Sequence, residues 1–208
     1  MPNIIPFDKK TKIYAVQPQI NIEFYSDEEL SKMFDWILNK YQTSKTTREL
    51  KYYKKYYLLI KILLRTGARI DEALAIRPVD INLDINTITL ITLKKKDKKA
   101  KRVLPLHFEL KSDIMQYYID NNINKNSTDR LFQMTRQSVN TFFKKMQKDL
   151  GFKIHAHKFR HTFAVKALMN GVPLNVLQQW LSHSSIFTTS IYTQITGMDT
   201  SQFMNKIN

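Results

Sequence analysis

The chain has 208 residues, no cysteine and a formal net charge of +15. The lack of cysteine excludes disulfides, thiolate metal sites and a cysteine nucleophile, while the 43% hydrophobic content is enough for a buried core. So large a positive charge favours a polyanionic partner, with nucleic acid ahead of an anionic membrane surface. The most apolar stretch, residues 56–64, contains Lys61 and is too short to span a bilayer, and residues 1–12 lack the apolar stretch of a signal peptide. We therefore expect a cytoplasmic globular protein.

The amino-terminal half shows an arm followed by helices. Residues 1–23 contain several prolines and little periodicity, so they are predicted to be an arm or linker. Ser26 and Glu29 form a capping box, and apolar residues from 30 to 38 follow the spacing of an amphipathic helix. A second, more apolar helix is predicted over 48–65 and ended by Gly67. A short helix over 70–76 is predicted to stop at Pro78.

The rest of the chain predicts a hairpin and then more helices. Residues 87–93 (TITLITL) alternate β-branched residues as a strand does, and residues 103–106 return as the partner strand after the basic run KKKDKKAKR. Helices are predicted over 108–121, 138–150, 158–170 and 174–181, with a turn or helix over 186–194 and a tail helix over 199–207. The predicted fold class is mostly α with a small antiparallel β-sheet (α+β). One domain over 24–195 would follow the arm at 1–23 and precede a tail at 196–208.

Several polar residues occur where packing gives no reason for them. Arg69 follows a Thr-Gly-Ala turn and opens a helix, while His157 and Arg160 are three apart at a helix start and share one face. His183 follows a predicted helix end, and Tyr192 comes nine residues later. Two arginines, two histidines, a lysine-bearing hairpin and a tyrosine are what the cleavage of a phosphodiester by covalent catalysis requires.

Each residue type has a physical role in such a reaction. A tyrosine phenol has an ordinary pKa of about 10, so it attacks well only when its proton is removed or shared. Guanidinium groups present forked donors that match the oxygens of a phosphate and stabilise the charge that develops on them. A lysine of the hairpin would protonate the departing 5′ oxygen, and histidines would shuttle the tyrosine proton or donate to the phosphate. This set of residues requires no metal.

In order along the chain, these motifs resemble the catalytic domain of the tyrosine recombinase (phage integrase) family. The motifs are TGARIDEALAIRPVDIN, the strand–lysine-rich turn–VLPL hairpin, HAHKFRHTFA, LSHSS and IYT, and they span roughly residues 24–194. The resemblance implies catalytic roles for Arg69, His157, Arg160, His183 and Tyr192, with Glu72 as a supporting acidic residue. It also implies a 3′-phosphotyrosyl intermediate, DNA strand exchange, and no cofactor or external energy source.

The chain departs from the family pattern in two places. Ser182 stands where the family usually has a glycine before its second histidine. The hairpin is longer than usual, so spacing alone does not identify the catalytic lysine. Lys96 fits when positions are counted back from Pro105, and Lys94 fits when they are counted forward from the first strand. We favour Lys96 and keep both.

The remaining basic residues and the short amino-terminal arm also bear on the resemblance to the family. We expect DNA contacts from Lys95, Lys98, Lys99, Lys101, Arg102 and Lys158. His155 and His161 flank the His-x-x-Arg pair and are interpreted as structural residues or loose DNA contacts. Residues 1–23 are too few for the amino-terminal helical domain that the family usually carries. The chain therefore resembles compact invertases of the fimbrial type or a catalytic fragment of a longer protein, and the initial methionine favours a complete gene product.

The resemblance also implies partners. Four protomers would assemble on two double-stranded recombination sites, with accessory DNA-bending proteins as further partners. Phe203, Met204 and Ile207 would form either a docking face on a neighbouring protomer or an intramolecular cap. The sequence leaves open the target site and whether the product is integration, excision, inversion or dimer resolution.

Two other functions remain as alternatives. Ala167, Gly171 and Leu177 fit the spacing of a helix-turn-helix, so the chain would instead be a non-enzymatic DNA-binding regulator. That interpretation leaves Arg69 and Tyr192 without a role. A type IB topoisomerase would use the same phosphotyrosine chemistry to relax DNA without exchanging strands.

Overall fold

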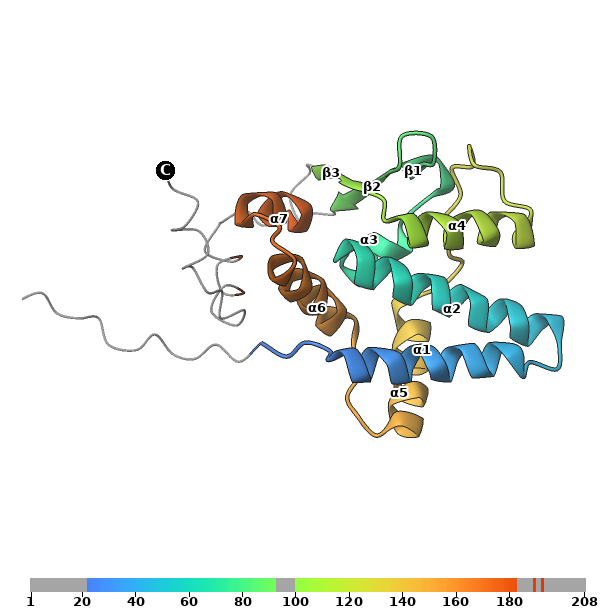
Figure 1. Ribbon diagram of the computed structural model, residues 1–208. Coiled ribbons are helices and arrows are strands. Elements are labelled where there is room, and N and C mark those ends of the chain that lie inside the picture. The colour runs from blue at the N-terminus through green and yellow to red at the C-terminus, as the bar shows by residue number, and fades with distance from the viewer. Residues whose placement is uncertain (1–21, 93–99, 183–188, 190–191, 193–208) are drawn as a thin grey trace, which may run out of the picture.

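The computed structural model describes residues 22–92, 100–182, 189 and 192 (Figure 1). Its elements, in chain order, are α1 (Asp27–Gln42), α2 (Thr47–Thr66), α3 (Ile70–Leu74), the short 3-10 helix η1 (Pro78–Asp80), β1 (Ile81–Asn82), β2 (Thr87–Thr92), β3 (Ala100–Pro105), α4 (Phe108–Asn121), α5 (Arg136–Leu150), α6 (Ala156–Met169) and α7 (Leu174–Leu181). This mostly helical architecture with one small sheet confirms the predicted fold class.

Local signals set most helix ends where the sequence predicts them. Ser26 accepts a hydrogen bond from the Glu29 backbone N–H, and the Glu29 carboxylate accepts from the Ser26 backbone N–H, so the capping box at the start of α1 is confirmed. The helices predicted over 108–121 and 174–181 agree with α4 and α7. The predicted segments over 186–194 and 199–207 lie outside the described residues, apart from positions 189 and 192.

The sheet has three antiparallel strands in the order β1-β2-β3. Within the hairpin, Thr92 pairs with Ala100 and Leu90 pairs with Arg102. Burial alternates along β2, as the sequence pattern predicts, so one face of the sheet packs on the core. Strand β1 was not predicted, because two residues are too few to show a periodic pattern.

The main core is organised around α2, which packs against α1, α4 and α6 (Figure 1). Tyr56 of α2 stacks flat on Phe142 of α5, with ring centroids 3.8 Å apart. A second apolar cluster joins α6 and α7 and includes Leu168, Leu177 and Tyr192. The core therefore fixes α6 against the end of α2, while the second cluster holds α7 and Tyr192 on α6.

No helix in the described part of the chain is both long and apolar enough to cross a membrane.

Tyr25 ties the segment before α1 to the start of α6. Its hydroxyl accepts from the His155 backbone N–H at 3.0 Å and donates to the His155 carbonyl at 3.3 Å. Its own backbone N–H donates to the Thr162 hydroxyl at 2.8 Å. The ring is fully buried beside Phe159, with centroids 4.7 Å apart. The first turn of α6 is therefore held in place from outside the helix.

We predict that Tyr25→Phe lowers the free energy of unfolding by about 1–2 kcal/mol, because the His155 backbone loses a buried partner. Urea unfolding followed by circular dichroism would measure the change. Tyr118→Phe is the matched control, since the Tyr118 hydroxyl is buried without a hydrogen-bond partner among the described residues. That control should be neutral or stabilising. Equal losses in both variants would contradict the assigned role of the Tyr25 hydroxyl.

Candidate active site

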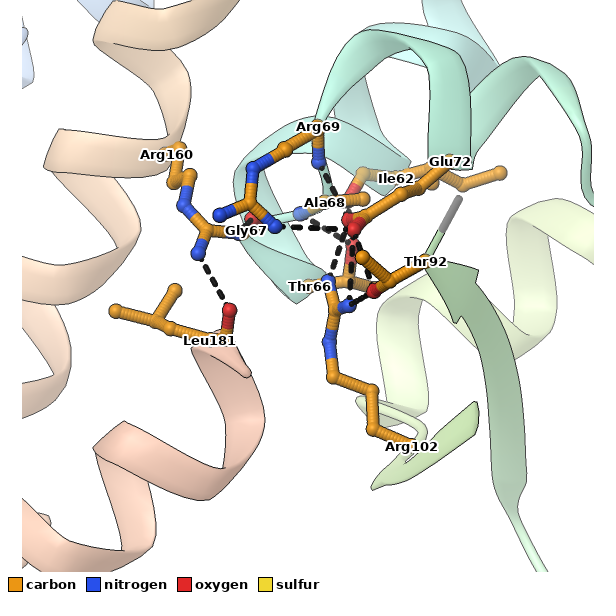
Figure 2. A network of polar contacts seen from close by, with 10 residues as sticks. All are labelled: Ile62, Thr66, Gly67, Ala68, Arg69, Glu72, Thr92, Arg102, Arg160 and Leu181. Carbon is orange, nitrogen blue, oxygen red and sulfur yellow. Dashed lines mark hydrogen bonds and ion pairs between the residues drawn. The ribbon is translucent and has the colours of Figure 1, made fainter. Parts of the chain in front are cut away.

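Arg69 and Glu72 are fixed to each other at the start of α3 (Figure 2). Arg69 is the residue that precedes the first turn, and its backbone N–H donates to Oε2 of Glu72 at 2.9 Å. Its guanidinium Nη1 donates to Oε1 of the same carboxylate at 3.2 Å. The Arg69 side chain is 43% exposed and that of Glu72 only 4%. The buried carboxylate of Glu72 therefore holds the partly exposed guanidinium of Arg69 in one orientation.

The same carboxylate holds the base of the β2–β3 hairpin. Arg102 on β3 donates from Nη2 to Oε2 at 2.6 Å and from Nη1 to Oε1 at 3.0 Å, and the Thr92 hydroxyl donates to Oε1 at 2.8 Å. Burial alone would raise the pKa of Glu72, but the hydrogen bonds and charge of Arg102 and the Arg69 backbone N–H lower it to about 2. Glu72 is therefore ionised at neutral pH and joins α3 to both strands (Figure 2).

Two residues predicted to contact DNA are buried and paired inside the protein. Arg102 is 8% exposed because its guanidinium lies against Glu72. Lys158 is also 8% exposed, with its Nζ 3.2 Å from a Glu29 carboxylate oxygen and 4.4 Å from the centroid of the Tyr25 ring. In this structure both side chains are therefore engaged in ion pairs within the protein, and their predicted DNA contacts stay predictions.

The remaining predicted DNA contacts divide by position. Lys101 of β3 is exposed, so its ammonium is accessible to a phosphate backbone. Lys95, Lys98 and Lys99 lie outside the described residues, as do the two candidate general acids, Lys94 and Lys96.

Arg160 on α6 is 1% exposed and is held by backbone carbonyls. Nη1 donates to the Gly67 carbonyl at 2.7 Å, and Nη2 donates to the Leu181 carbonyl. Burial lowers its pKa to about 10, and the charge of Arg69 contributes to the shift. The group therefore stays charged at neutral pH, and no ion pair joins it to a carboxylate of the described residues. A buried guanidinium that meets only carbonyl dipoles favours an anion beside it.

Gly67, whose carbonyl accepts from Arg160, lies where α2, α6 and α7 meet. It ends α2 with φ +60°, a left-handed conformation that favours glycine. A Cβ at this position would lie 2.5 Å from Cδ1 of Phe163 and 2.9 Å from Cδ2 of Leu181. The turn therefore requires glycine both for its backbone conformation and for the space between α2, α6 and α7.

Two histidines share a face of α6 next to Arg160. His157 is exposed in the first turn, and its ring centroid lies 4.3 Å from that of His161 in an edge-on contact. Burial lowers the pKa of His157, with Arg160 adding to the effect. Burial, together with the repulsion that a protonated His161 would meet from a protonated His157 and from Arg160, lowers the pKa of His161 to about 4. Both imidazoles are therefore neutral at pH 7.

Tyr192 is 2% exposed, and its hydroxyl lies 2.9 Å from Nδ1 of His161. Burial raises the pKa of the phenol, while the charges of Arg160 and Arg69 act in the opposite direction. The net shift is upward, so Tyr192 is protonated at neutral pH. This buried phenol needs a proton acceptor before it becomes a good nucleophile.

The contact of His161 with Tyr192 was not predicted from the sequence. The signal that could have found it is spacing, since His161 follows His157 by four residues and so lies on the same helix face. Of the predicted catalytic set, Arg69, His157, Arg160 and Tyr192 converge on one region, and His183 lies outside the described residues.

The electrostatic balance of this region favours an anion. Glu72 is the one buried carboxylate in the described part of the chain, and it is shared by the guanidinium groups of Arg69 and Arg102. Arg160 adds a third guanidinium that reaches toward Arg69 from the opposite side (Figure 2). The described residues contain no cluster of histidine and acidic side chains suited to hold a metal ion. The excess of positive charge suits one phosphodiester.

A comparison with known families matches residues 35–197 to the family described as the phage integrase family. The chain belongs to this family. A probable integrase/recombinase of Acholeplasma phage L2 is 33% identical over 181 residues, covering 82% of this chain and 57% of the relative. The tyrosine recombinase XerA of Saccharolobus solfataricus is 33% identical over 138 residues, covering 66% of this chain and 45% of the relative. The chain spans about half the length of these relatives.

Solved structures of the family share the fold. The XerH site-specific recombinase bound to its difH substrate, a pre-cleavage complex, superimposes with a TM-score of 0.62 at 25% identity, covering 89% of this chain and 53% of XerH. The catalytic domain of bacteriophage HP1 integrase gives a TM-score of 0.62 at 23% identity, covering 90% of this chain and 96% of that domain. Because the match to the HP1 domain covers 90% of this chain, it supports the fold assignment over nearly the whole chain.

We predict that Glu72→Gln lowers the free energy of unfolding at pH 7 by about 3–5 kcal/mol, because buried Arg102 loses its counter-charge. The pKa of Glu72 is depressed to about 2, so the stabilisation by the carboxylate is full above about pH 4.5 and is lost as the pH falls toward 2. The difference between wild type and variant should therefore shrink between these limits. Urea unfolding at pH 7 and at about pH 3 would measure it.

Asp71→Asn provides the control for this experiment. Asp71 is the preceding carboxylate and is exposed, with an ion pair to Arg136 at 3.3 Å. Its loss should cost less than about 1 kcal/mol. A deficit in Glu72→Gln that is the same at both pH values would argue against an ionised carboxylate at the centre of the network.

Proposed function

We propose that this chain is a site-specific DNA recombinase that cuts and rejoins strands through a 3′-phosphotyrosyl intermediate on Tyr192. The observation that carries the proposal is that Tyr192 is buried against α6 with its hydroxyl at His161, close enough to Arg160 and Arg69 for their charges to act on the phenol. The motifs that supply these residues occur in the order typical of the family to which the chain belongs. The match to that family lends no support to a regulator or a topoisomerase.

The proposed reaction is a transesterification. The Tyr192 oxygen attacks the scissile phosphorus, a P–O bond to the tyrosine forms, and the bond to the 5′ oxygen breaks. Arg69 and Arg160 stabilise the charge that develops on the non-bridging oxygens. A hairpin lysine, Lys96 or Lys94, protonates the departing oxygen, and His157 and His183 assist phosphate binding and proton transfer. Because one phosphoester replaces another, a 5′ hydroxyl reverses the step without an external energy source.

Double-stranded DNA is the proposed partner. The net charge of +15 favours a phosphate backbone, and XerH, a relative of the same fold, has been solved on a DNA substrate. We further propose that four protomers act on two DNA sites, since exchange between duplexes requires two cleaved sites to be held together. Joined recombinant products would identify a recombinase, whereas relaxed circles alone would identify a topoisomerase.

We predict that Tyr192→Phe abolishes the covalent adduct and changes DNA affinity by less than about two-fold, because it removes only the nucleophilic oxygen. The protein would be incubated with supercoiled DNA from its source genome, denatured, and examined for DNA attached to the Tyr192 peptide by mass spectrometry. Sequencing of the attached ends would define the cleaved site.

The control for that assay is Tyr52→Phe, which changes a partly exposed tyrosine of α2. This variant should form the adduct as the wild type does. Adduct formation by Tyr192→Phe, or its absence from the wild type on nicked substrates that trap the intermediate, would rule out the assigned nucleophile.

We predict that Arg160→Lys slows cleavage by about 100-fold or more, because an ammonium lacks the forked donors of a guanidinium. A lysine at this site would also be unable to bridge the carbonyls of Gly67 and Leu181 together with a phosphate. Adduct formation over time would give the rate, and urea unfolding would show whether the variant is folded. The conservative change Arg136→Lys on the exposed start of α5 is the control. Rates within a few-fold of wild type for Arg160→Lys would contradict its role.

A further inference from the structure

The hydrogen bond between His161 and Tyr192 is not used by any role assigned above. Nδ1 of His161 lies 2.9 Å from the Tyr192 hydroxyl, a distance typical of a hydrogen bond. The ring centroids lie 5.7 Å apart and are tilted by 54°, so the contact is made through the nitrogen rather than by stacking. The raised pKa of Tyr192 keeps its phenol protonated at neutral pH, and a neutral imidazole has one nitrogen free to accept a hydrogen bond.

The surroundings keep His161 neutral in the free protein. Partial burial is the largest factor that disfavours the imidazolium of His161. Repulsion from Arg160, and from His157 and His155 whenever these are protonated, adds to it, while Glu23 before α1 acts in the opposite direction. His161 is therefore unprotonated at physiological pH and has the capacity to take up a proton.

We infer that His161 is the general base that takes the proton of Tyr192 during strand cleavage, an inference that rests on the proposed recombinase function. As the Tyr192 oxygen bonds to phosphorus, its O–H bond breaks and the proton passes to Nδ1 of His161. The leaving 5′ oxygen receives a different proton, from the hairpin lysine. In the reverse step His161 returns its proton to the tyrosine oxygen as the phosphotyrosyl bond breaks, so protons balance over a full cycle.

Arrival of the DNA strengthens this base. The phosphodiester brings a negative charge next to Arg160, the group that contributes to the low basicity of His161. An anion offsets that repulsion and favours the imidazolium, so bound substrate shifts the pKa of His161 upward. A base with a pKa near the working pH is the most effective one.

His157 is the competing candidate, since the family motif gives it the catalytic position. It is exposed, and its contact with the site in the described structure is the edge-on packing against His161. No hydrogen bond between His157 and Tyr192 occurs among the described residues, whereas His161 has one. The geometry therefore makes His161 the proton acceptor for the phenol, and His157 keeps its proposed role in phosphate binding.

The first experiment tests the tautomer without using activity. Nitrogen-15 NMR of the free protein at pH 7, with the five histidines assigned by single substitutions, reports which ring nitrogen carries the proton. A base at this position requires Nε2–H and an unprotonated Nδ1. An Nδ1–H tautomer, or an imidazolium, would overturn the inference because neither has a free Nδ1 to accept the proton.

The second experiment compares His161→Asn with His161→Ala on a nicked duplex bearing the sequence found in the adduct assay. An asparagine amide oxygen near the position of Nδ1 accepts a hydrogen bond but takes no proton at neutral pH. Both variants should therefore form the phosphotyrosine about 100-fold or more slowly than wild type, with DNA affinity unchanged. A purely structural histidine would be rescued by asparagine, and a rate for His161→Asn within a few-fold of wild type would overturn the inference.

The matched control is His107→Asn, which changes the partly exposed histidine before α4, whose ring nitrogen accepts from the Glu109 backbone N–H and does not contact Tyr192. Its cleavage rate should stay near that of wild type.

Incorporation of 3-fluorotyrosine at position 192 makes the phenol more acidic, so the loss of cleavage rate caused by His161→Ala should become smaller. An unchanged deficit would overturn the inference. If the wild type formed no adduct, the proposed recombinase function itself would be refuted. If the wild type and His161→Asn both formed the adduct at similar rates, only the role of His161 as general base would be refuted.

Discussion

A single buried carboxylate organises the cationic half of the site. Glu72 binds Arg69 on its own helix and Arg102 from the hairpin, so a local turn and a segment 30 residues away are fixed to the same two oxygens. A lone carboxylate neutralises only part of the charge that converges there, because Arg160 adds a third guanidinium held by carbonyl dipoles. The excess positive charge is tolerated because each guanidinium is hydrogen-bonded. The region therefore carries a net positive charge that a bound anion would neutralise.

The second constraint is the packing of α6 against the end of α2. Gly67 has no side chain, so Phe163 and Leu181 approach its backbone closely and Arg160 reaches its carbonyl. Arg160 also binds the end of α7 through the Leu181 carbonyl, so one side chain joins three helices. The guanidinium that we propose binds phosphate is thus buried in the packing of the domain and held by two backbone carbonyls. Such preorganisation is what electrostatic stabilisation of a transition state requires.

The sequence predicted the helices and the hairpin because their signals are local. The capping box at Ser26 and the glycine after α2 depend on neighbours a few residues away. It did not reveal the burial and ion pairing of Arg102 and Lys158, because basic residues in a basic chain look solvent-exposed, and their partners Glu72 and Glu29 are distant in sequence. Pairing across such distances follows from tertiary packing, which no periodic pattern in a single sequence encodes. The family motifs supplied the candidate catalytic residues, since those residues are defined by chemistry and order rather than by burial.

The reactivity of Tyr192 in the free protein is limited by burial and by the weak basicity of its neighbour His161. Burial raises the pKa of the phenol, and burial together with the nearby charge of Arg160 makes His161 a weak base. Neither condition favours a phenolate, so the isolated site is a poor nucleophile toward stray electrophiles. A bound phosphodiester would offset the guanidinium groups, which raises the proton affinity of the imidazole and also removes part of their lowering effect on the pKa of the phenol. On the proposed mechanism, proton transfer from Tyr192 to His161 is therefore coupled to substrate binding through the electrostatics of one small region.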